Sequence, residues 1–274
     1  MALEGKPVAD RILKEVKEGV EELGFSPGLA IVRVGDDPAS KVYVSSKIKR
    51  AEEAGIKGTE HHLPETATEA ELLELVHQLN IDSSVHGFIV QLPLPPQINA
   101  EKVLEFIYPE KDVDGLHPLN LGKLVAGDPH FVPATPLGVM EMLSHYKIET
   151  AGKNAVVVGR SNMVGKPMSA LLLNANATVE TCHSRTKDLA EHTRRAEILV
   201  VAVGKPKLIT GEMVREGAAV IDVGINRIEG KLAGDVDFET VSKKARVSPV
   251  PGGVGKLTVA CLMKNVLKAA QEKK

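Results

Sequence analysis

Tyr43 and Lys47 lie four residues apart in a segment with helical patterning, and their side chains could form an acid–base site. This spacing places both on one face of a helix. An amine that is buried on a packed helix has a lowered pKa, which lets it accept or donate a proton near neutral pH. The alternative is an exposed helix on which Lys47, Lys49 and Arg50 form a solvated basic face.

Further polar candidates follow the apolar run HGFIVQ (86–91). Gln91 ends this predicted strand and begins a proline-rich loop, so its amide could hydrogen-bond a catalytic group. Asp112 and Asp114 lie in a Lys-Asp-Val-Asp-Gly loop. A carboxylate can pair with the aminopyrimidine edge of a pterin through two parallel hydrogen bonds. The same pattern also suits turn formation and helix capping, and both interpretations stay open.

The segment VVVGRSNMVGKP (156–167) has the strand–loop–helix order that places a pyrophosphate at a helix N-terminus. Gly159 ends the predicted strand, and Gly165 begins the predicted helix. The usual Gly-x-Gly-x-x-Gly pattern is incomplete, because Ser161 stands where the second glycine is expected. A tight turn without a ligand is the alternative.

The next predicted strand, ATVETCH (177–183), favours NADP over NAD. In NAD-binding proteins a carboxylate at the end of this strand accepts the ribose 2′-hydroxyl. Here the strand runs into Ser184 and Arg185, and Ser184 with Arg160 or Arg185 could bind a 2′-phosphate that a carboxylate would repel. Each arginine by itself could also be a solvated loop cation.

The turn after the strand AAVIDVG (218–224) is a second candidate wall of a nucleotide site. Ligands of parallel sheets bind outside the carboxyl ends of the strands, which would bring Gly224 and Ile225 near the nicotinamide. An ordinary strand-end turn is the alternative.

The segment PVPGGVGKLT (249–258) superficially suggests a phosphate-binding P-loop. It fails that pattern because Val250 stands where the first glycine is required. Pro251, Gly252 and Gly253 instead predict a rigid loop with accessible backbone at the start of a helix, which suits a flat ligand.

Apolar strands alternate with amphipathic helices along the chain, which predicts an α/β fold with parallel sheets. The expected strands are 29–35, 57–63, 86–91, 154–159, 177–183, 198–203 and 218–224. The expected helices are 40–54, 68–80, 136–148 and a last one from 254 almost to the C-terminus. The Pro- and Gly-rich stretch 109–136 is expected to be ordered but irregular.

The length of 274 residues predicts two domains. We expect residues 1–135 plus 256–274 to form one domain, and 136–255 a Rossmann-like NADP-binding domain.

Composition excludes several classes of function. A net charge of −2 and 3% aromatic residues argue against a nucleic-acid partner. Cys182 and Cys261 form no Cys-x-x-Cys pair, and the histidines have no zinc-site spacing, so no metal is expected. No signal-peptide core or long apolar run occurs, which favours a cytoplasmic protein without a membrane partner.

The motifs together resemble the bifunctional methylenetetrahydrofolate dehydrogenase/methenyltetrahydrofolate cyclohydrolase family. The resemblance covers nearly the whole chain, and several motifs in one order are more specific than any single motif. It is carried by YVSSKIKRAEEAGI (43–56), VQLPLP (90–95), PEKDVDGLHPLNLGKL (109–124), PATPLG (133–138), VVVGRSNMVGKPMSALL (156–172), CHSRT (182–186), DVGIN (222–226), GDVDF (234–238) and PVPGGVGKLTVACLM (249–263).

The resemblance implies roles for the matching positions. Lys47 is similar to the family's general acid–base lysine, and Gln91 to the glutamine that tunes it. Tyr43 matches the residue that lines the pterin and p-aminobenzoate portion, and Asp114 the aspartate that anchors the pterin. The NADP-contacting positions match Gly159, Arg160, Ser161, Ser184 and Ile225, to which the nucleotide pattern adds Gly165 and Arg185. The loop that closes over the folate matches Pro251, Gly252 and Gly253.

The resemblance also implies two α/β domains flanking a cleft, and a homodimer. It makes the domain of residues 1–135 plus 256–274 the folate-binding catalytic domain. This chain departs from the family pattern at Ala134, where a cysteine is usual, so a cysteine nucleophile cannot be required. It departs again at Lys256 and Leu257, where the family usually has Pro-Met. The added cation could alter the preference for the folate tail.

The function implied is NADP-dependent oxidation of 5,10-methylenetetrahydrofolate followed by hydrolysis to 10-formyltetrahydrofolate. The nearest alternative is a monofunctional dehydrogenase, against which Tyr43, Lys47 and Gln91 argue. A dehydrogenase of small carbonyl acids would need cations for its substrate instead of Asp114. A nucleotide-sensing module would bind NADP without turnover. A Tyr-x-x-x-Lys pair also occurs in short-chain dehydrogenases, but there it follows the nucleotide loop in the same domain.

Overall fold

The computed structural model describes residues 2–228 and 230–273. The chain forms two compact units. The first-half unit contains Arg11–Ala134 and the segment from Val259 onward, and the second-half unit contains Thr135–Thr258 and the residues up to Asp10. The divisions after Asp10 and after Thr258 fall inside helices α1 (Gly5–Leu23) and α10 (Val254–Gln271). The third, after Ala134, falls at the start of α6 (Ala134–His145). The sequence-based division differs mainly in grouping the first ten residues with the first half.

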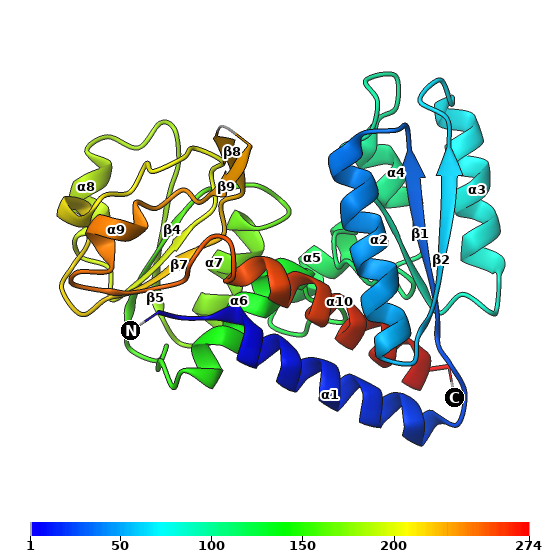
Figure 1. The fold of residues 1–274 in the computed structure, drawn as a ribbon, viewed down its shortest axis with the longest axis horizontal. Helices are drawn as coiled ribbons and strands as arrows, with labels where there is room; N and C mark the ends of the chain where they lie inside the picture. Colours follow the sequence, from blue (N-terminus) through cyan, green and yellow to red (C-terminus); the bar gives the residue numbers. More distant parts are fainter. Residues whose placement is uncertain (1, 229, 274) are drawn as a thin grey trace. The chain divides into compact units, whose positions relative to one another are not determined.

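The first-half unit is built on a parallel sheet with the strand order β2-β1-β3. Its strands are β1 (Gly28–Val34), β2 (Lys57–Leu63) and β3 (Gly87–Val90). Its helices include α2 (Pro38–Glu53), α3 (Glu69–Ile81), α4 (Ala100–Phe106) and α5 (Pro118–Val125). Figure 1 shows α2 and α3 beside β1 and β2. All residues of β1 and β3 are buried, as expected for apolar strands of a parallel sheet covered on both faces.

The second-half unit has a five-stranded parallel sheet with the order β10-β7-β6-β4-β5. Its strands are β4 (Asn154–Val158), β5 (Thr178–Cys182), β6 (Ile198–Val201), β7 (Ala219–Asp222) and β10 (Arg246–Val247), with a separate hairpin of β8 (Asn226–Ile228) and β9 (Lys231–Ala233). Its other elements are α6 (Ala134–His145), α7 (Gly165–Asn174), α8 (Leu189–Thr193), α9 (Phe238–Val241) and a 3₁₀ turn at Gly211–Met213. The predicted parallel α/β architecture is confirmed.

The prediction that 109–136 is irregular was wrong for its middle, which forms α5. The helix begins at Pro118, whose fixed φ suits a first helical position. His117 caps it, because its Nδ1 accepts a hydrogen bond of 3.0 Å from the Leu119 N–H. Proline was taken as a loop signal here, although it equally marks a helix start. The hairpin β8–β9 and helix α1 were also not foreseen.

Asn265, on the α10 segment that belongs to the first-half unit, joins two loops of that unit. It is 4% exposed, and its Nδ2 donates to the Val113 carbonyl at 2.8 Å and the Val132 carbonyl at 2.9 Å. Within the described residues, no helix combines the length and apolar character needed to cross a membrane.

Replacing Asn265 by alanine is expected to lower the free energy of unfolding by about 2 kcal/mol or more, because two buried carbonyls lose their donor. The urea midpoint of unfolding measures the effect. Gln271→Ala, at an exposed position of the same helix, is the matched control. Equal urea midpoints for Asn265→Ala and Gln271→Ala would contradict the stabilising role of Asn265.

Candidate active site

Lys47 and Gln91 meet between α2 and the carboxyl end of β3. The Lys47 Nζ donates to the Gln91 Oε1 at 2.9 Å, and the Gln91 Nε2 donates to the Leu92 carbonyl at 2.7 Å. The second bond fixes which end of the amide faces the lysine. The α2 helix that carries Lys47 begins with Pro38 and is capped by Asp37, whose carboxylate accepts from the Ser40 N–H at 2.7 Å. The predicted contact between a lysine and a strand-end glutamine is therefore present.

The electrostatics of Lys47 fit an acid–base group. Burial lowers the pKa of Lys47, and the negative charge of Asp114 opposes that shift. Burial raises the pKa of Asp114, and the Lys47 charge opposes that shift in turn. Tyr43 lies one helical turn from Lys47 and is 40% exposed, so it can contact a ligand. The alternative of a fully solvated Lys47 is excluded, whereas Lys49 and Arg50 are exposed.

Asp112 has a different task from Asp114. It is 1% exposed, and its Oδ2 accepts from the His117 N–H at 2.7 Å and from the Asn120 Nδ2 at 2.8 Å. Burial raises the pKa of Asp112 to about 7. The two interpretations of the aspartate loop therefore apply to different residues. Asp112 stabilises the start of α5 through these hydrogen bonds, and Asp114 remains the candidate for binding a ligand.

We expect the cyclohydrolase kcat to rise with pH, because the neutral form of Lys47 accumulates as pH passes its lowered pKa. Asp114 favours the charged lysine, so Asp114→Asn is expected to lower the Lys47 pKa further and move the midpoint to lower pH. The measurement is kcat against pH for both proteins, with the uncatalysed rate subtracted. A midpoint that moves to higher pH would contradict this coupling.

The second-half unit has a hollow of about 440 Å³ at the carboxyl ends of β4, β5 and β6. It is lined by Val158, Gly159, Arg160, Ser161, His183, Ser184, Thr186, Leu189, Ala202, Val203, Lys205 and Leu208. Parallel sheets bind nucleotides at this end. Four predicted cofactor residues, Gly159, Arg160, Ser161 and Ser184, lie on its wall.

Backbone geometry explains the glycines of the nucleotide loop. Gly159 has φ +131°, and a Cβ there would overlap the Ala202 carbonyl oxygen. A Cβ at Gly165 would overlap the Gly159 carbonyl. Ser161 replaces the second glycine of the common pattern and contributes at the helix start: its Oγ accepts from the Val164 N–H at 3.2 Å and the Gly165 N–H at 3.4 Å. The incomplete glycine pattern therefore still builds the required turn.

Three predicted residues do not line this hollow. Gly165 allows the close packing of the nucleotide loop but does not line the hollow itself. Ile225 is 49% exposed on the turn after β7. Arg185 is exposed, with its backbone N–H bound to the His183 Nδ1 at 3.2 Å. Lys205 lies on the wall instead and was missed. Its only sequence signal is its position just after the strand ending at Val201.

The loop before α10 is closely packed: Gly252 is half-buried and Gly253 is buried, so the predicted accessible backbone is not found at Gly253. The Gly5 N–H donates to the Gly252 carbonyl at 2.8 Å, and Gly253 packs closely on Pro249, whose carbonyl oxygen would lie 2.6 Å from a Cβ. Pro251 is exposed. Of the departures from the family pattern, Leu257 is fully buried and Lys256 is exposed, so only the cation changes the surface.

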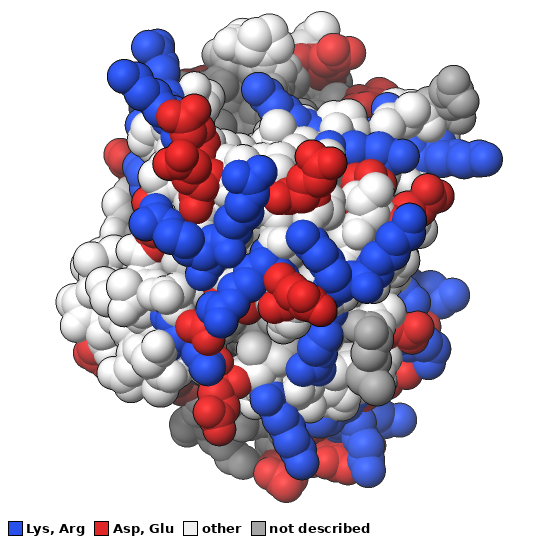
Figure 2. All heavy atoms as spheres, turned by 90° about the vertical axis from the view of Figure 1, so that its left-hand side faces the viewer, with Lys and Arg blue, Asp and Glu red and all other residues white. Residues whose placement is uncertain are grey.

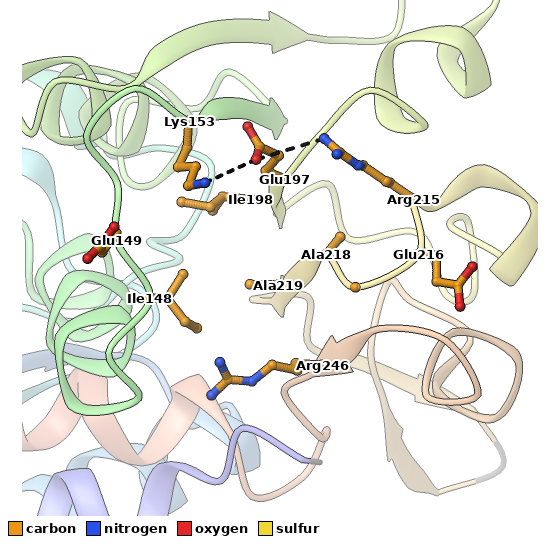
Figure 3. Close-up of a pocket in the computed structure, with 11 residues that line it drawn as sticks. Ile148, Glu149, Lys153, Glu197, Ile198, Arg215, Glu216, Ala218, Ala219 and Arg246 are labelled. Atoms are coloured by element: carbon orange, nitrogen blue, oxygen red, sulfur yellow. Dashed lines mark hydrogen bonds and ion pairs between the residues drawn. The ribbon is translucent and has the colours of Figure 1, made fainter.

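A second hollow, of about 220 Å³, lies at the opposite ends of β6 and β7 (Figure 3). Lys153 and Arg215 both approach Glu197, at 3.2 and 3.8 Å, and Glu197 also accepts from the Asn154 N–H at 3.1 Å. Three of its charged residues, Lys153, Glu197 and Arg215, are thus paired with one another. Figure 2 shows basic and acidic side chains interspersed over one face.

Among residues 2–228 and 230–273, one group of three potential metal ligands comes together: Glu180, Cys182 and His192. Arg195 already lies 3.5 Å from the Glu180 carboxylate and 3.4 Å from the His192 Nδ1. Burial, reinforced by Glu180, raises the pKa of the Cys182 thiol, which favours the form that does not bind metals. We therefore assign no metal to this group.

A strand-end nucleotide loop on one α/β unit and a half-buried lysine on another define the class of dinucleotide-dependent α/β enzymes. Residues 3–114 match the model of the tetrahydrofolate dehydrogenase/cyclohydrolase catalytic domain, and residues 133–274 match that of its NAD(P)-binding domain. The chain belongs to the tetrahydrofolate dehydrogenase/cyclohydrolase family.

Similar proteins agree with this membership. The "Bifunctional protein FolD" of Nautilia profundicola is 54% identical, over 98% of this chain and 96% of its own. The crystal structure of the bifunctional enzyme FolD from Campylobacter jejuni has a TM-score of 0.98 and 51% identity, covering 100% of this chain and 99% of its own. The Trypanosoma brucei FolD structure, complexed with NADP cofactor and inhibitor, has a TM-score of 0.95 and 40% identity, covering 100% and 98%.

Proposed function

We propose that this chain oxidises 5,10-methylenetetrahydrofolate to 5,10-methenyltetrahydrofolate with NADP and then hydrolyses the product to 10-formyltetrahydrofolate. The observation that carries the proposal is the Lys47–Gln91 hydrogen bond of 2.9 Å beside Asp114, on a lysine whose pKa burial lowers. A monofunctional dehydrogenase would have no use for this acid–base arrangement. The proposal is supported by the bifunctional relatives named above.

Lys47 is the proton-transfer group of the hydrolytic step. Water adds to the methenyl carbon and forms a C–O bond, and the bond from that carbon to N5 breaks, which yields the 10-formyl group and releases one proton. Neutral Lys47 accepts the proton from the attacking water, since a protonated amine cannot. Gln91 orients the amine through its Oε1. Asp114 pairs with the pterin, and Tyr43 lines its ring and the p-aminobenzoate portion.

NADP fits the hollow of the second-half unit. Gly159 and Gly165 leave room for backbone to approach a pyrophosphate, and α7 begins there. Arg160, Ser184 and Lys205 supply a hydroxyl and two cations for the 2′-phosphate. When bound, NADP supplies a hydride acceptor. The protein residues position the cofactor and shield it, which is where the advantage in such transfers arises.

The remaining assignments belong to the same proposal. The folate site lies in the predicted domain 1–135 plus 256–274, and the NADP site in 136–255. Pro251, Gly252 and Gly253 contribute to folate binding, and Gly159, Arg160, Ser161, Gly165, Ser184, Arg185 and Ile225 to cofactor binding. The protein acts as a homodimer in the cytoplasm.

A spectroscopic assay of the purified protein tests the proposal. Turnover of 5,10-methylenetetrahydrofolate is measured with NADP and with NAD, and the decay of methenyltetrahydrofolate is measured alone. We expect turnover with NADP and methenyl decay faster than the uncatalysed rate. Dehydrogenation without faster decay would leave a monofunctional enzyme, and no turnover in either assay would refute the proposal.

A further inference from the structure

Asp235 is a fully buried carboxylate that holds two loops at the carboxyl end of the second-half sheet. It is 0% exposed. Its Oδ2 accepts from the backbone N–H groups of Val203 at 2.7 Å and Gly204 at 3.0 Å. Its Oδ1 accepts from the Asn226 Nδ2 at 2.9 Å. One side chain therefore ties the turn after β6 to the turn after β7.

Asp222, the last residue of β7, is a second buried carboxylate in the same place. Its Oδ1 accepts from the N–H groups of Gly224 and Asp235, both at 3.0 Å, and its Oδ2 accepts from the Val236 N–H at 3.0 Å. Burial raises the pKa of Asp222 to about 6. The three donors offset the cost of burying this group.

Two glycines leave the space that the carboxylates fill. A Cβ at Gly224 would overlap the Asp235 carboxylate, and a Cβ at Gly234 would overlap the Asp222 carboxylate. We call Asp222 and Asp235, with the N–H groups that they accept from, the carboxylate clamp. Its two aspartates come from segments 13 residues apart in the chain.

The carboxylate clamp borders the nucleotide hollow. Val203, whose N–H binds Asp235, lines that hollow. Ile225 lies between Gly224 and Asn226, and both neighbours are bound to clamp carboxylates. The side chain of Ile225 itself is half exposed, so its position is set by these backbone and side-chain anchors.

We propose that Asp235, supported by Asp222, is a positioning residue for hydride transfer: it fixes Val203 and the Ile225 turn against the nicotinamide end of the bound dinucleotide. This inference rests on the proposed function. The clamp lies in the second-half unit, whereas Lys47 and Gln91 lie in the first-half unit. Its loss therefore impairs the dehydrogenase and spares the cyclohydrolase.

The test exchanges the hydrogen-bond donor and acceptor between Asn226 and Asp235. In Asp235→Asn the amide oxygen can still accept from the Val203 and Gly204 N–H groups, but its NH₂ then faces the Asn226 NH₂. Turning the Asn226 amide over would relieve this clash only by giving up its bond to the Ala233 carbonyl at 3.3 Å. We expect the dehydrogenase kcat of this variant to fall roughly 10- to 100-fold through misplacement of the ring, with the cyclohydrolase rate within about twofold. Adding Asn226→Asp places an acceptor opposite the new NH₂ but leaves the Ala233 carbonyl without its donor, so part of the lost rate is expected to return.

Asp237→Asn is the matched control, because the Asp237 carboxylate binds the Thr240 hydroxyl at 2.9 Å outside the clamp. If Asp235→Asn does not fold, Asn226→Ala removes one donor only and is expected to show a smaller loss of the same kind. A parallel fall of both activities, unchanged dehydrogenase activity, or no recovery in the exchanged pair would each overturn the clamp.

Calorimetric titration with NADP separates this inference from the proposed function, and it needs no intrinsic fluorophore in a chain that lacks tryptophan. Asp235→Asn is expected to raise the dissociation constant for NADP several-fold, and the exchanged pair to restore it in part, whether or not the folate reaction occurs. If the wild-type protein binds NADP but turns over no folate, the proposed function fails. The NADP dissociation constants of the variants then still test the carboxylate clamp. Equal constants for all proteins would overturn it.

Discussion

Replacing Lys47 by methionine is expected to lower the cyclohydrolase rate by roughly 10²- to 10⁴-fold, the usual contribution of a positioned acid–base group. Methionine keeps the length of the side chain but removes the amine, and it leaves the Gln91 Oε1 without its donor. NADP affinity is expected to remain unchanged, because the nucleotide hollow belongs to the other unit. The decay of methenyltetrahydrofolate measures the effect.

Lys49→Met is the control for this variant. Lys49 lies on the same helix, α2, but is exposed, so its loss is expected to leave both activities intact. Cyclohydrolase activity that survives in Lys47→Met would remove the lysine from the mechanism. Equal losses in both variants would point to a general effect on the helix.

Replacing Gly165 by alanine is expected to weaken NADP binding by roughly 10- to 100-fold, which corresponds to about 1–3 kcal/mol of strain. The new methyl group would overlap the Gly159 carbonyl, so the nucleotide loop has to move away from the start of α7. Because this loop and Lys47 lie in different units, the cyclohydrolase rate is expected to stay near the wild-type value. A titration of NADP and the methenyl decay assay measure the two quantities.

Gly122→Ala is the matched substitution for Gly165→Ala. Gly122 lies inside α5, where a Cβ meets nothing within 4 Å, and alanine favours a helix. This variant is expected to bind NADP normally. Wild-type affinity in Gly165→Ala would show that the loop accommodates a side chain and that its close packing is not required.

The sequence was informative where residue type, spacing and strand ends coincide. The strand end predicted that Gln91 could bond a catalytic group, and the family resemblance implied that this group is Lys47, 44 residues away. The glycines at 159 and 165 were predicted as a nucleotide loop even with Ser161 between them. In both places a local pattern indicates which part of the chain faces the site.

Other features depend on three-dimensional proximity that no local pattern encodes. The sequence offered Arg160 or Arg185 for the 2′-phosphate. Arg160 lies on the wall of the hollow, and Lys205, from the next strand end, joins it there without having been predicted. The sequence assigned no role to Asp222, which lies in a predicted strand, or to Asp235. Only the fold shows that both are buried and that backbone N–H groups satisfy them.

The overlap between Gly224 and the Asp235 carboxylate, and between Gly234 and the Asp222 carboxylate, also predicts how this region can diverge among descendants. A side chain at either glycine requires the opposing carboxylate to be lost or shortened, so the four positions should drift in two pairs, 224 with 235 and 234 with 222. A descendant that gains alanine at position 224 or 234 and keeps the opposing aspartate should have a slow dehydrogenase. Its cyclohydrolase should keep its normal rate.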